Sequence, residues 1–275
     1  MSRPVITFLT DFGPAAPAVC RGVMFGIAPD ANIIDVSHQV TRYAIGEGAG
    51  TLVFALPHMP IGVHVAVVDP GVGTERLGLA LKVERGDILI GPDNGLLIPA
   101  AERLGGIIEA RSIENRELML PVISSSFHGR DIFSPVAGHL SMGTPFESVG
   151  PEVPIERLVR LPIPRPTILR GELETEIVHI LVFGNVTLAG VPADLQAAIG
   201  PVSPGDALTL EFQPVDGRQG TTEVTTWERT FGRVPVGASL LMADSEGHLS
   251  FADNQGNAAA RLELSLGQRV SIRRA

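Results

Sequence analysis

Short apolar runs alternate with helix-like segments through the first half of the sequence, and this alternation limits the fold more than any other feature. The runs are continuously apolar, as in Val63–Val68, so both faces of such strands must be covered. The pattern therefore predicts an α/β domain with a mostly parallel sheet covered by helices. Strands are predicted at Val5–Leu9, Asn32–Val36, Val63–Val68, Leu77–Val83, Asp87–Ile90 and Gly106–Ala110. Helices are predicted at Val19–Ala28, Ala44–Leu56, Leu96–Leu104 and Asp131–Leu140.

The pattern changes after Pro151. Five prolines between residues 151 and 166 predict a connector. Short strand-like runs separated by turn residues follow, which is typical of an antiparallel sheet or a small barrel. These runs are Glu176–Phe183, Ala207–Phe212, Thr221–Thr226, Ser239–Ala243, Leu249–Ala252 and Arg269–Ile272. The sequence thus predicts two domains, an α/β domain over residues 1–160 and a smaller all-β domain over residues 167–275.

Composition excludes several classes of protein. The formal net charge is −9 and no basic patch is present, which argues against a nucleic-acid partner. No apolar run reaches the roughly 18 residues that a membrane helix needs. The first apolar run, Val5–Leu9, is too short for a secretory signal, so a cytoplasmic location is expected. The single cysteine, Cys20, excludes an internal disulfide and a cysteine-based zinc site.

Three side chains suited to chemistry are expected at one edge of the predicted sheet. Asp11 follows the first strand, and Asp69 ends a later one, with Arg76 seven residues beyond it. Because the carboxyl ends of parallel strands meet at the same edge, Asp11 and Asp69 should share that edge. His128, at the start of a predicted helix, is able to join them there. This edge of the sheet would then combine a carboxylate, a guanidinium and an imidazole on its loops.

Each of these residues also has a purely structural interpretation. Asp11 is a good turn residue, Asp69 with Arg76 could form an exposed salt bridge, and His128 could simply begin a helix. Arg130 and Asp131 could likewise be no more than polar residues at the start of that helix. No histidine spacing supports a metal site, so none is predicted. A turn is expected at Pro92–Gly95. The remaining histidines are interpreted as structural or surface residues: His38, His58, His64, His139, His179 and His248.

Seven segments occur in the order in which one known family carries its motifs. They are Leu9–Gly13, Pro29–Ala31, Asp35–His38, Val63–Arg76, Gly91–Gly95, Phe127–Phe133 and Phe183–Asn185. Through them the chain resembles the S-adenosylmethionine hydrolases, or hydroxide adenosyltransferases, which are relatives of the fluorinases and chlorinases. The resemblance implies an N-terminal α/β domain, a C-terminal β domain and a homotrimer. It also implies active sites between the N-terminal domain of one subunit and the C-terminal domain of the next.

The resemblance further implies hydrolysis of S-adenosyl-L-methionine to adenosine and L-methionine, by attack of water on the ribose 5′ carbon. No cofactor is implied, because S-adenosylmethionine is the substrate. The positions that would handle the water are Asp69, Arg76 and His128. The positions implied to bind the substrate are Asp11 for the ribose hydroxyls, Asn185 for the adenine, Tyr43 and Phe127 beside the ribose, and Ser245 near the methionine. The halogenating enzymes differ at the aspartate and histidine positions, which favours water as the nucleophile.

Three positions depart from the family pattern where the methionine half of the substrate would lie. Ala16 and Leu181 fall in stretches where the family carries aspartates, and Glu246 would repel a carboxylate. The alternatives are therefore a hydrolase of another 5′-activated adenosine derivative, or a non-catalytic trimer that binds adenosine. Halide transfer is a further, weaker alternative.

Overall fold

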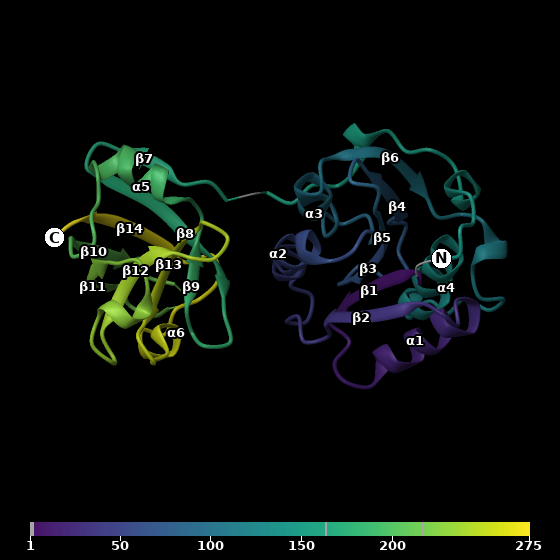
Figure 1. Cartoon of the computed structure of the whole chain (residues 1–275), viewed down its shortest axis with the longest axis horizontal. Coiled ribbons are helices and arrows are strands. Elements are labelled where there is room, and N and C mark those ends of the chain that lie inside the picture. The colour runs from purple at the N-terminus through teal and green to yellow at the C-terminus, as the bar shows by residue number, and fades with distance from the viewer. Residues whose placement is uncertain (1–2, 163, 216) are drawn as a thin grey trace. The chain divides into compact units, whose positions relative to one another are not determined.

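The computed structural model describes residues 3–162, 164–215 and 217–275 of the 275-residue chain. Residues 1 and 2, at the start of the predicted first domain, and residue 163, in the predicted connector, lie outside the described residues. The chain divides into two compact units, Met1–Leu161 and Pro162–Ala275, so the division falls within the proline-rich segment. In Figure 1 the first unit runs from purple to teal and the second from green to yellow.

The first unit is built on one six-stranded sheet with the order β2-β1-β3-β5-β4-β6. The strands are β1 (Val5–Thr10), β2 (Asn32–Ser37), β3 (Val63–Val67), β4 (Gly78–Val83), β5 (Ile88–Pro92) and β6 (Ile107–Ser112). Strands β2, β1, β3 and β5 pair in parallel, whereas β4 is antiparallel to both of its neighbours. The predicted α/β class with a mostly parallel sheet is confirmed, and β4 is the exception to it.

The direction of β4 follows from the length of its link to β5. The two strands are joined by a tight turn in which Gly86 N donates to Val83 O and Val83 N donates to Asp87 O. Parallel neighbours need a crossover of a dozen or more residues, so a link this short can only form a hairpin. The apolar pattern predicted both strands, but the turn decides that they are antiparallel.

Helices cover both faces of this sheet (Figure 1). The helices are α1 (Ala16–Ile27), α2 (Ile45–Ala55), α3 (Ile98–Arg103) and α4 (Ser134–Ser141). Successive residues of β3 point to opposite faces, so Val65 packs in one buried cluster with Met24 of α1, and Ala66 packs in the other with Leu52 of α2. No helix in the described part of the chain is long and apolar enough to cross a membrane.

The second unit is a closed barrel. Its strands are β7 (Thr167–Leu169), β8 (Glu172–Ile180), β9 (Val186–Leu188), β10 (Ala207–Phe212), β11 (Thr221–Trp227), β12 (Ser239–Ala243), β13 (Leu249–Asp253) and β14 (Arg269–Arg274). Pairing runs from β14 through β10, β11, β12, β13 and β9 to β8, and β8 pairs back with β14. The predicted small β domain is thus confirmed, and of the strands in its described residues only the short β7 lies outside the ring.

Two short helices in the second unit, α5 (Pro192–Ile199) and α6 (Ala258–Arg261), were not predicted. The start of α5 does have a sequence signal, because Pro192 stands at its first position and Asp194 accepts a hydrogen bond from Val191 N. Shorter helical turns are Leu56–His58, Arg116–Leu118, Gly129–Phe133, Phe146–Val149, Ile155–Arg157 and Phe231–Arg233.

Candidate active site

The ends of β1 and β3 form one wall of a pocket in the first unit. The two strands are parallel neighbours with Thr10 opposite Val67, so Asp11 and Asp69 both leave the sheet at its carboxyl edge. Five of the residues that the sequence analysis selected line this pocket: Asp11, Tyr43, Asp69, Phe127 and His128. The structure therefore places these side chains, which are up to 117 positions apart in the sequence, around one cavity of about 240 Å³.

Asp69 and Arg76 form a largely buried ion pair. Arg76 Nε donates to both carboxylate oxygens of Asp69 at 3.2 and 3.0 Å, and Arg76 Nη2 donates to Oδ2. Their side chains are 4% and 11% exposed, respectively, so the pair is not the exposed salt bridge of the structural interpretation. The guanidinium also lies 5.3 Å from the ring centroid of Phe133. Because water is largely excluded, the pair holds the carboxylate in a fixed orientation.

The same guanidinium contacts His128. Arg76 Nη2 lies 2.9 Å from His128 Nδ1. A guanidinium can only donate, so Nδ1 must accept and the ring proton must sit on Nε2. Burial lowers the pKa of His128, Arg76 lowers it further, and the carboxylates of Asp69 and Asp131 oppose these effects. At neutral pH the pocket therefore holds an imidazole with an Nε2–H donor.

Gly73 fixes the loop between Asp69 and Arg76 against the segment that leads to His128. Its φ of +78° lies in the region that favours glycine. A Cβ at this position would come within 2.3 Å of the carbonyl oxygen of Ser125. The two loops can therefore approach this closely only because residue 73 is a glycine.

A π-helical turn, Gly129–Phe133, follows His128 and precedes α4, where the sequence predicted one helix from Asp131 to Leu140. Such turns occur often at functional sites. Asp131 is fully buried and accepts hydrogen bonds from Ser124 N at 2.8 Å and from Arg130 Nε at 2.6 Å. Arg130 in turn lies 5.1 Å from the ring centroid of Phe127. Asp131 thus binds Ser124 and Arg130, on either side of Phe127 and His128, and fixes the loop between them. The sequence analysis missed this role.

Asp11 is linked to Tyr43 through the backbone. Its Oδ2 accepts a hydrogen bond from Tyr43 N at 2.9 Å. Tyr43 has a φ of +67°, which is rare for a bulky residue and often marks a functional site. Its side chain is exposed and lines the pocket. An aromatic surface is thereby held beside a carboxylate at the mouth of the cavity.

His38, interpreted from the sequence as a structural or surface residue, supports the turn that carries Asp11. Nδ1 of the His38 ring lies 2.9 Å from Thr10 Oγ1. The backbone oxygen of His38 accepts a hydrogen bond from Gly13 N at 3.0 Å. On its other side, Nε2 lies 3.1 Å from Asp35 Oδ1. His38 therefore contacts residues on both sides of Asp11. The motif Asp35–His38 was the only sequence signal for this arrangement.

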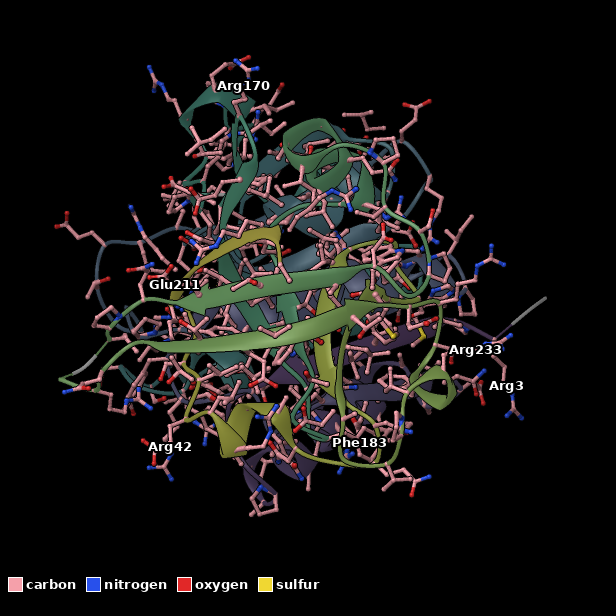
Figure 2. The ribbon with its side chains drawn as sticks, turned by 90° about the vertical axis from the view of Figure 1, so that its left-hand side faces the viewer. Arg3, Arg42, Arg170, Phe183, Glu211 and Arg233 are labelled. Atoms are coloured by element: carbon pink, nitrogen blue, oxygen red, sulfur yellow. The ribbon has the colours of Figure 1, made fainter. Side chains whose placement is uncertain are left out.

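Asn185 and Ser245, the two predicted site residues of the second unit, lie on different turns. Asn185 precedes β9 and accepts from Leu181 N through its backbone oxygen, whereas Ser245 lies in the turn before β13. Because β9 and β13 are antiparallel, these turns are at opposite ends of the strand pair. The structure thus does not bring the two residues together within the barrel. Next to Asn185, Phe183 is 75% exposed at the edge of the unit (Figure 2).

The positions that depart from the family pattern have contrasting surroundings. Ala16 begins α1 and is half-buried, and Leu181 is 37% exposed. Glu246 donates through its backbone nitrogen to Asp244 Oδ1 in the turn that also carries Ser245.

Among the described residues, no group of three or more histidine, cysteine, aspartate or glutamate side chains is placed to hold a metal ion.

Comparison with family models matches the chain to two domains in the same order. Residues 6–150 match the SAM hydroxide adenosyltransferase N-terminal domain, and residues 175–271 match the C-terminal domain. A protein of Salinispora tropica named (R)-S-adenosyl-L-methionine hydrolase is 40% identical, covering 98% of this chain and 97% of the relative. A protein of the same name from Thermus thermophilus is 36% identical over 98% of this chain and 99% of its own length. A fluorinase of an Actinoplanes species is 27% identical over 99% of this chain and 98% of its own.

Two solved structures are also similar. A conserved protein from Thermotoga maritima gives a TM-score of 0.86 at 34% identity, covering 98% of this chain and all of the other. A conserved protein from Thermus thermophilus gives a TM-score of 0.72, again at 34% identity and over 98% of this chain and all of the other.

Proposed function

The chain belongs to the SAM hydroxide adenosyltransferase family, and on that premise we propose that it hydrolyses S-adenosyl-L-methionine (SAM) to adenosine and L-methionine. The observation that carries the proposal is that Asp69 and His128, which both line one pocket, contact the same guanidinium, that of Arg76. These are the groups that a displacement by water requires. The chain is therefore an enzyme of this family rather than a binding module.

In the proposed reaction a water molecule attacks the ribose 5′ carbon. Its oxygen forms the new C–O bond while the C–S bond breaks, and the electron pair of that bond remains on the methionine sulfur. The sulfonium thus leaves as a neutral thioether and needs neither an acid nor a cofactor. The proton of the water passes to the carboxylate of Asp69 and then to solvent. Correct placement of the water supplies most of the acceleration.

Arg76 orients the carboxylate of Asp69, and His128 would orient the attacking water. Arg76 donates hydrogen bonds to both carboxylate oxygens of Asp69, so the oxygen lone pairs that remain free point in a fixed direction. His128, with its proton on Nε2, is a donor to the water oxygen rather than a base. A water that donates to Asp69 and accepts from His128 has its free lone pair oriented for attack.

The remaining predicted residues would bind the nucleoside. Asp11 can accept hydrogen bonds from both ribose hydroxyls. Tyr43 and Phe127 offer aromatic surfaces at the same pocket. Asn185 would bind the adenine and Ser245 the methionine, as the family resemblance implies.

We further propose that the enzyme is a homotrimer with sites at subunit interfaces. The pocket of the first unit has about 240 Å³, which is below the ~300–1,000 Å³ of typical small-molecule sites. A C-terminal domain from a neighbouring subunit would supply the missing wall. The cytoplasmic location predicted from the sequence stays a prediction.

A second candidate substrate is another adenosine activated at the 5′ position. Ala16 and Leu181 have no side-chain acceptor for an ammonium group, and Glu246 would repel a carboxylate. The decisive quantity is the ratio of the dissociation constants for adenosine and SAM, measured by calorimetry. Much tighter binding of SAM removes the second candidate, whereas equal binding favours it.

The proposal is tested by incubation with SAM in ¹⁸O-labelled water, with and without chloride, followed by mass spectrometry of the nucleoside. Labelled adenosine is expected in both samples. A 5′-chlorinated nucleoside would indicate halide transfer, and no turnover together with tight adenosine binding would indicate a non-catalytic protein. Either result overturns the proposal.

A pair of variants links the activity to the site. Asp69→Asn removes the acceptor for the water and should lower turnover by about 10²–10⁴. Glu109→Gln is the matched control, because Glu109 forms a partly buried ion pair with Arg111 in the same unit, away from the pocket. Turnover should be unchanged in this control.

A further inference from the structure

The turn Pro92–Gly95 was predicted from the sequence, but the site described so far does not use it. Asn94 Nδ2 donates to the carbonyl oxygen of Val68 at 2.8 Å, and Asp93 N donates to the carbonyl oxygen of Leu77 at 2.9 Å. Val68 immediately precedes Asp69, and Leu77 immediately follows Arg76. One turn therefore holds both ends of the loop that carries the ion pair.

The turn is itself held firmly. Asn94 Oδ1 accepts from Leu96 N at 3.2 Å, which closes a local turn. Asp93 Oδ1 accepts from Val159 N at 2.9 Å. Gly95 has a φ of +92°, and a Cβ there would lie 2.9 Å from Leu161 N. Packing on this side leaves the turn little freedom to follow the loop if the loop shifts.

We infer that Asn94 is a positioning residue for the proposed hydrolysis, because its amide fixes the backbone from which the Asp69 carboxylate projects. The inference rests on the proposed function for its catalytic meaning. Asn94 does not line the pocket and acts only through the loop. Misplacement of a catalytic group by about 1 Å can cost about 10²-fold in rate, so a hydrogen bond outside the pocket can influence turnover.

The chain offers a matched control for Asn94. Asn115 Nδ2 donates to Ser148 O at 2.8 Å, and its Oδ1 accepts from Glu117 N at 3.0 Å. It thus makes the same two kinds of hydrogen bond in the same unit, without contacting the loop or lining the pocket. Asn94→Ala and Asn115→Ala should lose similar stability. Only the first should disturb the reaction.

Asn94→Asp separates the two hydrogen bonds of the residue. Aspartate keeps the acceptor for Leu96 N but places an oxygen, rather than a donor, against Val68 O. The inference therefore predicts that Asn94→Asp is as harmful to the reaction as Asn94→Ala. Retention of wild-type turnover by Asn94→Asp would overturn it.

The kinetic readout is the steady-state hydrolysis of SAM. We expect kcat to fall at least tenfold in both Asn94 variants, with KM within about twofold of wild type, because the loop orients the water rather than the nucleoside. Asn115→Ala should keep the wild-type kcat at a similar melting temperature. The inference is overturned if kcat follows thermal stability equally at the two positions.

A second readout does not depend on any activity. Burial lowers the pKa of His128 most; of the charged groups that face the ring, Arg76 lowers the pKa further, whereas Asp69 and Asp131 raise it. Because a shift of the loop moves both Arg76 and Asp69 relative to His128, an NMR titration of the histidine rings should show a changed His128 pKa in Asn94→Ala and no change in Asn115→Ala. An unchanged His128 pKa overturns the inference. If wild-type protein does not hydrolyse SAM but the titration behaves as expected, only the proposed function has failed.

Discussion

Arg76 Nη2 lies 2.9 Å from His128 Nδ1, although 52 positions separate the two residues in the sequence. The same guanidinium binds both oxygens of Asp69. A group that can only donate therefore assigns different roles to its two neighbours. Asp69 accepts from it through both oxygens, whereas His128 accepts through Nδ1 and is left as a neutral donor at Nε2.

The first prediction concerns pH. Because the folded pKa of His128 is lowered, the neutral ring persists below its ordinary pKa of about 6.5. Protonation would place an N–H group against Arg76, so kcat should be constant near neutrality and fall only below about pH 6.5. The pH dependence of kcat measures this, with His139→Asn as the control for loss of a histidine. An acid limb above pH 6.5 would contradict the assignment of His128 as the titrating donor.

Gly73→Ala should destabilise the protein and impair catalysis together. The positive φ costs about 1–2 kcal/mol for a non-glycine residue, and the clash with Ser125 O adds about 1–3 kcal/mol. Gly106→Ala is the control, since Gly106 has a φ of +99° but open space around its Cβ position. Urea unfolding of both variants separates the clash from the backbone strain. Equal losses in the two variants would show that the loops can separate at little cost.

Tyr43→Gly should raise stability while lowering activity. Glycine relieves the strain of the φ of +67° by about 1 kcal/mol and retains the N–H that donates to Asp11. The variant loses only the aromatic surface, so the proposed role of Tyr43 beside the ribose predicts a higher KM for SAM. Gln255→Gly, at a φ of +54°, should gain similar stability without any kinetic change. An unaltered KM in Tyr43→Gly would remove Tyr43 from the substrate site.

Asp87 should make the protein sensitive to acid. It is fully buried and accepts hydrogen bonds from His64 Nε2 at 2.9 Å and from Arg85 Nη2 at 3.0 Å. Burial alone would raise the pKa of Asp87, but these partners outweigh it and hold the pKa well below its usual range. The unfolded chain thus binds more protons in acid, and this contribution to stability is complete above about pH 4–5 and declines as the pH falls further.

Urea unfolding at several pH values tests this prediction. Asp87→Asn should lower the free energy of unfolding at pH 7 by about 3–5 kcal/mol, because Arg85 then keeps a partly buried charge without its counter-ion. The same variant should also flatten the dependence of stability on pH between 2 and 5. A wild-type slope that survives in Asp87→Asn would assign the acid sensitivity to other carboxylates.

Much of the fold was accessible from the sequence because it depends on local patterns. Continuous apolar runs identified β1 and β3, and the turn residues after Pro151 identified the barrel strands. The direction of β4 was not accessible from apolarity, since the length of the turn before β5 decides it. Helix α5 was missed because its signals are a proline and a cap within a region otherwise rich in strand-forming residues.

The sequence by itself determined that Asp11 and Asp69 leave the sheet at one edge, because parallel neighbouring strands end on the same side. Only the tertiary structure decided that Arg76 binds both Asp69 and His128. The same holds for the complete burial of Asp131 and for the hydrogen bond from Asn94 to the backbone just before Asp69. Strand direction follows from patterns a few residues long, whereas these contacts join segments tens of residues apart. Their geometry depends on how closely the loops pack, which no local pattern encodes.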